Sequence, residues 1–225
     1  MKAARPQRTW VEPEQLASLL EAATGTLRPV LAVLAGCGLR VGEACARDWP
    51  DISIPTATID VGRAKTDAGV RQVNIPIGPL EELIEWRARR PAYQGKDDPA
   101  FITDPPNGRP ASRQTRRNVE AQLKRAIKPA NERLDELGIE PISEKVTPHS
   151  LRRTYASVRA AAGDDPVYIA EQLGHADMAL TFRLYQKAVK RRSKLSGHHL
   201  REFDRALEWA ANGQQAHWRR LSRLR

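Results

Sequence analysis

The sequence has few cysteines and no long apolar run. Only Cys37 and Cys45 occur in 225 residues, and they do not form a CxxC pair. Their scarcity excludes a disulfide-stabilised secreted domain and a cysteine-based zinc or redox site. The longest apolar stretch, residues 30–35, is far shorter than the roughly 20 residues that cross a bilayer. Residues 1–10 are basic but lead into no apolar signal segment, so we expect a cytoplasmic protein without a membrane span.

Acidic residues are outnumbered, and the excess positive charge is local. The chain has 37 Lys and Arg against 27 Asp and Glu, a net charge of +10. Residues 109–128 hold seven basic residues and one acidic residue, and residues 186–225 hold eleven and three. The rest of the chain is net negative. Either stretch alone is typical of a solvated helix face, but the two together favour a nucleic-acid partner.

The apolar spacing predicts an α+β fold that is predominantly helical and has a small antiparallel sheet. Residues 52–61 and 71–75 alternate and carry β-branched side chains, which indicates a hairpin or meander. Residues 91–110 and 138–147 are expected to be loops. Residues 27–35 are almost wholly apolar, so we expect that helix to be central. Helices are predicted over residues 13–23, 27–35, 40–47, 80–90, 113–137, 148–162, 166–173, 178–185 and 198–211.

Arg40 and Lys65 are candidate site residues because of their positions. Arg40 begins a predicted helix after the glycine-containing turn at residues 36–38, where its guanidinium can reach past a closely approaching backbone. Lys65 lies near the tip of the predicted hairpin. Taken alone, each is better explained as an ordinary exposed polar side chain.

Residues 146–157, VTPHSLRRTYAS, combine a helix start with two groups that bind anions. Thr147 can cap a helix that begins at Pro148, which places His149 in the first turn, where free N–H groups and the helix dipole favour an anion. Arg152 lies three residues on and shares the face of His149. The pattern predicts a phosphate site, although a partly buried histidine beside a surface arginine explains it equally well.

Residues 169–186, IAEQLGHADMALTFRLYQ, have the pattern of a helix-turn-helix. Gly174 would stand at the turn, and residues 178–185 would form the recognition helix. A non-enzymatic DNA-binding protein is therefore an alternative to an enzyme. In such a protein, changing Tyr185 to Phe would leave the function intact.

Five short motifs, read in order, resemble those of the catalytic domain of the tyrosine recombinases, or phage integrases. They are GLRVGE (38–43), AKT (64–66), HSLR (149–152), LGH (173–175) and a tyrosine ten residues later. The resemblance runs from about residue 9 to residue 188. It implies the fold of that catalytic domain and a site-specific recombinase, the integrase of a phage or mobile element, that cleaves and rejoins DNA.

The resemblance also implies a role for six residues around a scissile DNA phosphate. Tyr185 would be the nucleophile that forms a 3′-phosphotyrosyl intermediate. Arg40 and Arg152 would hold the nonbridging oxygens, which gain charge in the transition state. The resemblance implies no cofactor and no metal, and because the phosphotyrosyl bond retains the energy of the broken linkage, the DNA can be resealed without ATP. The remaining roles are proton acceptor for His149, proton donor to the leaving 5′ oxygen for Lys65, and hydrogen bonding to the phosphate for His175.

The expected division of the chain is an N-terminal segment at 1–12, the catalytic domain at 13–188 and a basic tail with an amphipathic helix at 189–225. Relatives usually carry a helical N-terminal domain that closes around the DNA, whereas about a dozen residues precede the first catalytic-domain helix here. The spacing of ten residues from His175 to Tyr185 is one longer than the commonest in the family. The implied partners are double-stranded DNA and further copies of the chain, assembled as a tetramer on DNA in the bacterial or phage-infected cell.

The basic stretch at residues 109–128 supplies the candidate DNA contacts outside the catalytic cluster. A type IB topoisomerase would share the same residue chemistry, and relaxation of a supercoiled plasmid without a specific site would separate the two enzymes. The DNA-binding candidates are Arg113, Arg116, Arg117 and Lys124.

Overall fold

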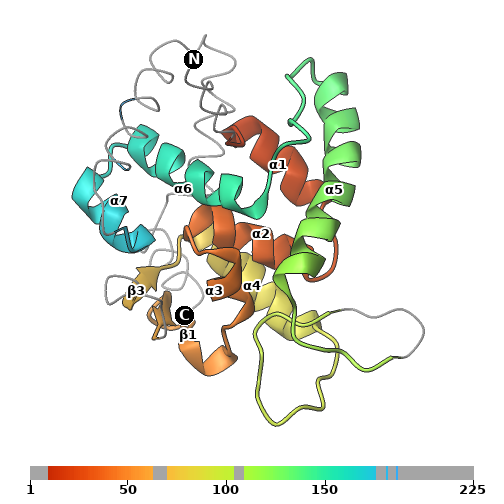
Figure 1. The fold of residues 1–225 in the computed structure, drawn as a ribbon, viewed down its shortest axis with the longest axis vertical. Helices are drawn as coiled ribbons and strands as arrows, with labels where there is room; N and C mark the ends of the chain where they lie inside the picture. The colour runs from red at the N-terminus through yellow and green to blue at the C-terminus, as the bar shows by residue number, and fades with distance from the viewer. Residues whose placement is uncertain (1–9, 63–69, 104–108, 176–180, 182–185, 187–225) are drawn as a thin grey trace, which may run out of the picture.

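Helix α2 (Leu27–Gly36) forms the centre of the molecule, as its apolar sequence predicts. All of its residues except Arg28 are buried, because a helix that is apolar on every side has to be covered on every side. In the computed structural model, which describes residues 10–62, 70–103, 109–175, 181 and 186, α2 packs against α1 (Pro13–Ala22), α4 (Ile77–Arg89), α5 (Arg116–Glu136) and α6 (Pro148–Ala162) (Figure 1).

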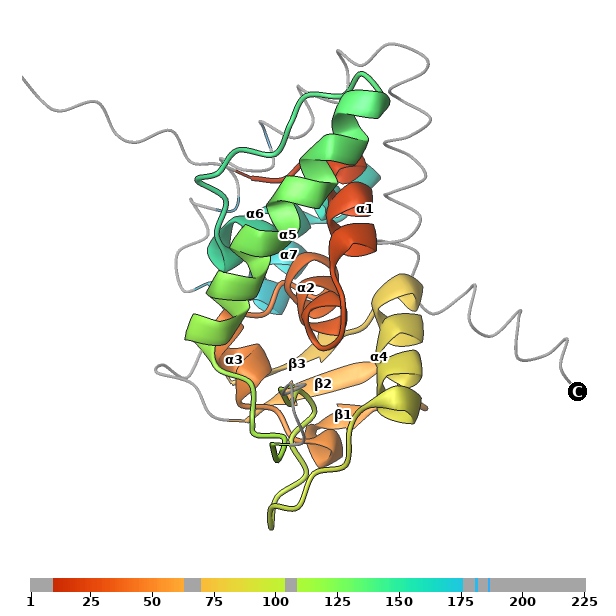
Figure 2. The same cartoon turned by 90° about the vertical axis from the view of Figure 1, so that its right-hand side faces the viewer.

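The sheet is a three-stranded antiparallel meander in the order β1–β2–β3. Its strands are β1 (Ile52–Ser53), β2 (Thr58–Val61) and β3 (Arg71–Asn74), and Val61 pairs with Arg71. Figure 2 shows the sheet between α3 (Val41–Cys45) and α4. Of the predicted hairpin or meander, the structure shows the meander: the chain turns at residues 54–57, so residues 52–61 hold two paired strands. Pro55 lies in that turn, where it removes a donor from any ladder.

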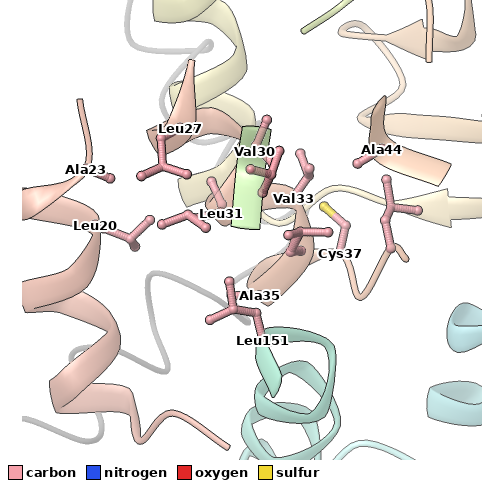
Figure 3. Packing of buried hydrophobic residues seen from close by; sticks show 14 of the residues in the cluster. Leu20, Ala23, Leu27, Val30, Leu31, Val33, Ala35, Cys37, Ala44 and Leu151 are labelled. Atoms are coloured by element: carbon pink, nitrogen blue, oxygen red, sulfur yellow. The ribbon is translucent and has the colours of Figure 1, made fainter. Parts of the chain in front are cut away.

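Two clusters of buried apolar side chains form the core of the molecule. In the larger one, side chains of α1, α2 and α6 meet, among them Leu20, Leu31 and Leu151, each at most 5% exposed (Figure 3). The second cluster joins α6 to α7 (Pro166–Leu173) through Tyr155 and Leu173. Replacing a leucine at such a position with alanine typically costs ~2–5 kcal/mol of stability, so these contacts fix how α6 and α7 stand against the central helix.

The ends of α6 and α7 lie where the sequence predicts them. The Ser150 hydroxyl accepts a hydrogen bond from the Thr147 N–H at 3.1 Å at the start of α6. The Asp165 carboxylate accepts from the Val167 N–H at 2.7 Å at the start of α7. Both helices begin with a proline, whose missing N–H is not needed there.

The fold class is confirmed: it is mostly helical with a three-stranded antiparallel sheet. The hairpin tip with Lys65, the helix expected at 178–185 except for Thr181, and the helix expected at 198–211 lie outside the described residues. In the part of the chain that the structure describes, no helix is long and apolar enough to cross a membrane.

Candidate active site

A tight turn between α2 and α3 presents Arg40. Gly38 has a φ of 70°, and a Cβ there would stand 2.8 Å from carbons of both Leu173 and Tyr155. Glycine therefore lets the turn approach the second apolar cluster closely. Arg40 follows in an extended conformation immediately before α3. Its side chain is 45% exposed, and it donates from Nη2 to the Gly174 carbonyl at 3.3 Å.

Arg152 reaches the same place from α6, and its side chain is 2% exposed. Its Nη1 donates to the Gly38 carbonyl at 2.5 Å, and its Nη2 donates to the Leu173 carbonyl. Burial, followed by repulsion from Arg40, lowers the pKa of Arg152 to about 9. The guanidinium is therefore still protonated at neutral pH.

Glu43 lies among three guanidinium groups. It accepts from the Arg40 backbone N–H at 2.8 Å and from Arg40 Nη1 at 2.6 Å. Arg71, on β3, contacts both oxygens of the same carboxylate, with Nη2 3.1 Å from Oε2, and Arg152 Nη1 lies 3.9 Å from Oε2. Burial raises the pKa of Glu43, but the hydrogen bonds from Arg71 and Arg40 outweigh it and bring the pKa below its usual value.

His175 follows the end of α7 and turns toward this cluster. Its backbone N–H donates to the Ala170 carbonyl at 3.0 Å, and its Nδ1 lies 2.9 Å from the Thr181 hydroxyl. Burial, followed by the positive charges of Arg152, Arg40, His149 and Arg71, lowers the pKa of His175 to about 4. At neutral pH the ring is therefore uncharged.

The structure brings together four of the six predicted catalytic residues. Arg40 and Arg152 donate to the neighbouring carbonyls of Gly174 and Leu173. His149 is exposed in the first turn of α6, close enough to His175 that a positive charge on it lowers the pKa of His175. The cluster carries more positive than negative charge, which suits the binding of an anion. The other two residues, Lys65 and Tyr185, lie outside the described residues.

Glu43 and Arg71 are not among the site residues predicted from the sequence. Glu43 stands three residues after Arg40, which precedes α3, and a glutamate at that spacing typically bonds back to the first backbone N–H of a helix. The sequence alone could therefore have predicted the contact of Glu43 with the start of α3. Arg71 gave no such signal, because its partners lie far away along the chain.

The four predicted DNA contacts differ in how they are held. Arg113 bridges Asp48, at 2.6 Å, and Asp97, so its charge is already paired within the protein. Arg116 pairs with Glu120 at 2.7 Å on the exposed surface of α5. Arg117 and Lys124 are exposed on that helix, seven residues apart and therefore on one face. Among the described residues, no group of three or more His, Cys, Asp or Glu side chains is placed to hold a metal ion.

Comparison with known proteins shows what this chain is similar to. The sequence profile of the phage integrase family matches residues 9–203. Tyrosine recombinase XerC of Chlorobaculum parvum is 30% identical over 163 residues, which are 68% of this chain and 43% of that protein. XerC of Methylobacterium sp. is 32% identical over 162 residues, 70% of this chain and 44% of that protein. The chain thus spans less than half the length of these relatives.

Solved structures show the same fold. The crystal structure of XerA recombinase superposes with a TM-score of 0.63 at 27% identity, over 90% of this chain and 65% of that one. The integrase of transposon Tn1549, solved in complex with transposon right end DNA, gives a TM-score of 0.69 at 20% identity, over 87% of this chain and 68% of that one.

Proposed function

The chain belongs to the phage integrase family, and we propose that it is a tyrosine-type site-specific recombinase that cleaves and rejoins DNA through a 3′-phosphotyrosyl intermediate. One observation carries this proposal. Arg40 and Arg152, far apart in the sequence, converge on the same helix end beside His175. Such a cluster matches what the transition state of phosphodiester cleavage needs, namely fixed donors where negative charge develops.

The proposed reaction has two reversible steps. The Tyr185 oxygen forms a bond to phosphorus while the bond to the 5′ oxygen breaks. The phenol proton passes to His149, and the 5′ oxygen takes a proton from Lys65. Only about 0.1% of a phenol with pKa near 10 is ionised at pH 7, so the proton acceptor and the neighbouring positive charges are needed. Rejoining reverses the step, as a 5′-hydroxyl attacks the phosphotyrosyl bond.

Arg40 and Arg152 would each face one nonbridging oxygen. A guanidinium has five N–H donors, and Arg152 uses two of them on the Gly38 and Leu173 carbonyls, so others remain for the phosphate. The Arg152 side chain is 2% exposed in the structure. Arg40, at 45% exposure, would meet the phosphate first.

His175 would act as a neutral hydrogen-bond donor. With a pKa of about 4 it carries a single ring proton at pH 7. If the Thr181 hydroxyl donates to Nδ1, that proton resides on Nε2, which would then donate to a phosphate oxygen.

Double-stranded DNA is the proposed substrate, and the exposed basic side of α5 is its proposed contact. Solved relatives of the same fold, such as the Tn1549 integrase and XerH recombinase, are bound to DNA, and a λ integrase dimer is solved on a core site. We propose that this chain assembles as a tetramer on DNA in the cytoplasm of the bacterial cell, as the family resemblance implies.

The test is covalent capture on nicked DNA. The chain is incubated with duplexes of randomised sequence that carry a nick at a fixed position, because the short fragment released beside the nick diffuses away and traps the adduct. Adducts that survive SDS are recovered and sequenced, which supplies a selected duplex. With that duplex, in EDTA, the wild type and Tyr93→Phe should form the adduct and Tyr185→Phe should not. Tyr93 is a matched control because it is also a tyrosine, but its hydroxyl contacts Asp97 in the loop after α4 and not a residue of the candidate active site.

Each outcome decides between the candidate functions. The absence of an adduct with the wild-type chain, or an adduct with Tyr185→Phe, would overturn the proposal. DNA binding without an adduct, unaffected by Tyr185→Phe, would support the helix-turn-helix alternative. Relaxation of a supercoiled plasmid that lacks the selected site would indicate a type IB topoisomerase. Loss of the adduct in EDTA would contradict the metal-free mechanism.

A further inference from the structure

We propose that Arg71 is a positioning residue for the cleavage reaction: it holds the Glu43 carboxylate away from Arg152, so that the charge of Arg152 remains available to the scissile phosphate. This inference rests on the proposed recombinase function. It assigns a task to a residue of β3 that lies outside the six predicted catalytic residues.

Arg71 is bound at both ends of its guanidinium. Nη2 lies 3.1 Å and Nη1 3.4 Å from the two Glu43 carboxylate oxygens. Nε donates to the Gln172 carbonyl at 2.7 Å. The side chain is 8% exposed, and these three groups face protein acceptors. We therefore expect Arg71 to act through the residues that it contacts, Glu43 and Gln172.

The last turn of α7 receives three arginines on three successive carbonyls. Gln172 accepts from Arg71, and the two following carbonyls accept from the two catalytic arginines, Leu173 from Arg152 and Gly174 from Arg40. A helix C-terminus leaves its last carbonyls without partners in the helix and carries partial negative charge, which cations stabilise. The end of α7 therefore sets the spacing of the three guanidiniums.

Strand β3 fixes α7 in this position through further bonds. The Asn74 N–H donates to Gln172 Oε1 at 2.8 Å, and the Asn74 side-chain amide donates to the Tyr168 hydroxyl at 2.9 Å. Gln172 donates in turn to the Gln72 carbonyl at 3.4 Å. Because these bonds remain when Arg71 is replaced, the helix should stay docked, and the change should be confined to the carboxylate.

The distances show what Arg71 prevents. Glu43 Oε2 lies 3.1 Å from Arg71 and 3.9 Å from Arg152. Without Arg71, a small rotation of the carboxylate would bring it into direct contact with Arg152 and neutralise the charge that the phosphate needs. Arg40 already uses its backbone N–H and its Nη1 on this carboxylate.

The test compares binding with cleavage on the selected duplex. For Arg71→Met, we expect the single-turnover rate of adduct formation at saturating protein to fall ~10–100-fold, the scale of a misplaced catalytic group, while the Kd for DNA stays at the wild-type value. Arg71→Lys keeps the charge but not the planar fork, and should give an intermediate rate. Arg90→Met is the matched control, because Arg90 also bonds a carboxylate and a backbone carbonyl, those of Asp98 and Pro99. Its rate should not change.

A double-mutant cycle with Glu43→Gln separates positioning from a general loss of structure. If Arg71 acts through the carboxylate, Arg71→Met should reduce the rate far less in the Glu43→Gln background than in the wild type. Thermal melts identify any variant that fails to fold, in which case Arg71→Lys carries the comparison.

The outcomes also separate this inference from the proposed function. No adduct with the wild-type chain would overturn both. An adduct with the wild type, together with rates for Arg71→Met and Arg71→Lys equal to that of Arg90→Met, would overturn the inference alone. Full additivity of the effects of Arg71→Met and Glu43→Gln on the rate would also overturn it. So would a weaker Kd for DNA that accounts for the whole loss of rate.

Discussion

Replacing Gly38 with alanine tests how closely the turn before Arg40 packs on α6 and α7. The residue has a φ of 70°, which costs a residue with a Cβ roughly 1–2 kcal/mol. The new Cβ would lie 2.8 Å from Leu173 Cδ2 and 2.8 Å from Tyr155 Cδ1, and overpacking of this kind typically costs ~1–3 kcal/mol. We therefore expect Gly38→Ala to destabilise the chain by about 2–5 kcal/mol.

Thermal unfolding followed by circular dichroism measures this effect. For a chain of this size, 1 kcal/mol shifts Tm by roughly 2–4 °C, so Gly38→Ala should lower Tm by about 4–20 °C. Gly163→Ala is the control, because Gly163 also has a positive φ, 92°, but a Cβ there meets nothing within 4 Å. Its cost should be the backbone strain alone, roughly 1–2 kcal/mol. Equal shifts for the two variants would refute the packing argument.

Three further predictions concern titration, DNA binding and proton transfer. The pKa of His175 is about 4 in the folded chain against 6.5 ordinarily, so the folded state binds fewer protons than the unfolded state between those values. Stability should therefore fall as the pH drops through that window. Between pH 7 and pH 5, Tm should fall less for His175→Gln than for the wild type. Arg117→Gln and Lys124→Gln should each reduce the slope of log Kd against log salt by about 1, whereas Arg113→Gln, which breaks pairs with Asp48 and Asp97, should lower Tm with little change in that slope. Lys65→Ala should cleave slowly and recover when the leaving 5′ oxygen is replaced by sulfur, which needs no proton donor; the lack of recovery in a single-turnover assay would reject the donor role.

Local signals in the sequence were sufficient to place the helices that carry the site. Thr147 precedes Pro148 at the start of α6, and Gly174 follows the last residue of α7, as predicted; both helices begin and end at the predicted residues. Capping chemistry depends on residues within one turn of each other, which is why it can be read from a sequence. Helix α4 begins three residues earlier than predicted, at Ile77, because its Gly-Pro pair lies in the first turn, where proline is tolerated.

Long-range partners could not be predicted in the same way. Arg71 meets Gln172 only because β3 lies beside α7, and neither residue indicates that docking by itself. Arg113 shows the same limit for charge, since a basic stretch does not reveal that one of its arginines is already paired with Asp48 and Asp97. The residue types and order of the motifs predicted which residues form the candidate site, whereas the contacts of Glu43 and Arg71 with those residues required the structure.

If Arg40 and Arg152 act together on one phosphate, the loss of either should slow adduct formation on the selected duplex. Removing one such preorganised donor typically costs ~10²–10³ in rate. Of the two side chains, that of Arg40 is the more exposed. The Arg40→Met variant should therefore form the Tyr185 adduct ~10²–10³ times more slowly than the wild type at saturating protein. An adduct formed at the wild-type rate would contradict the account.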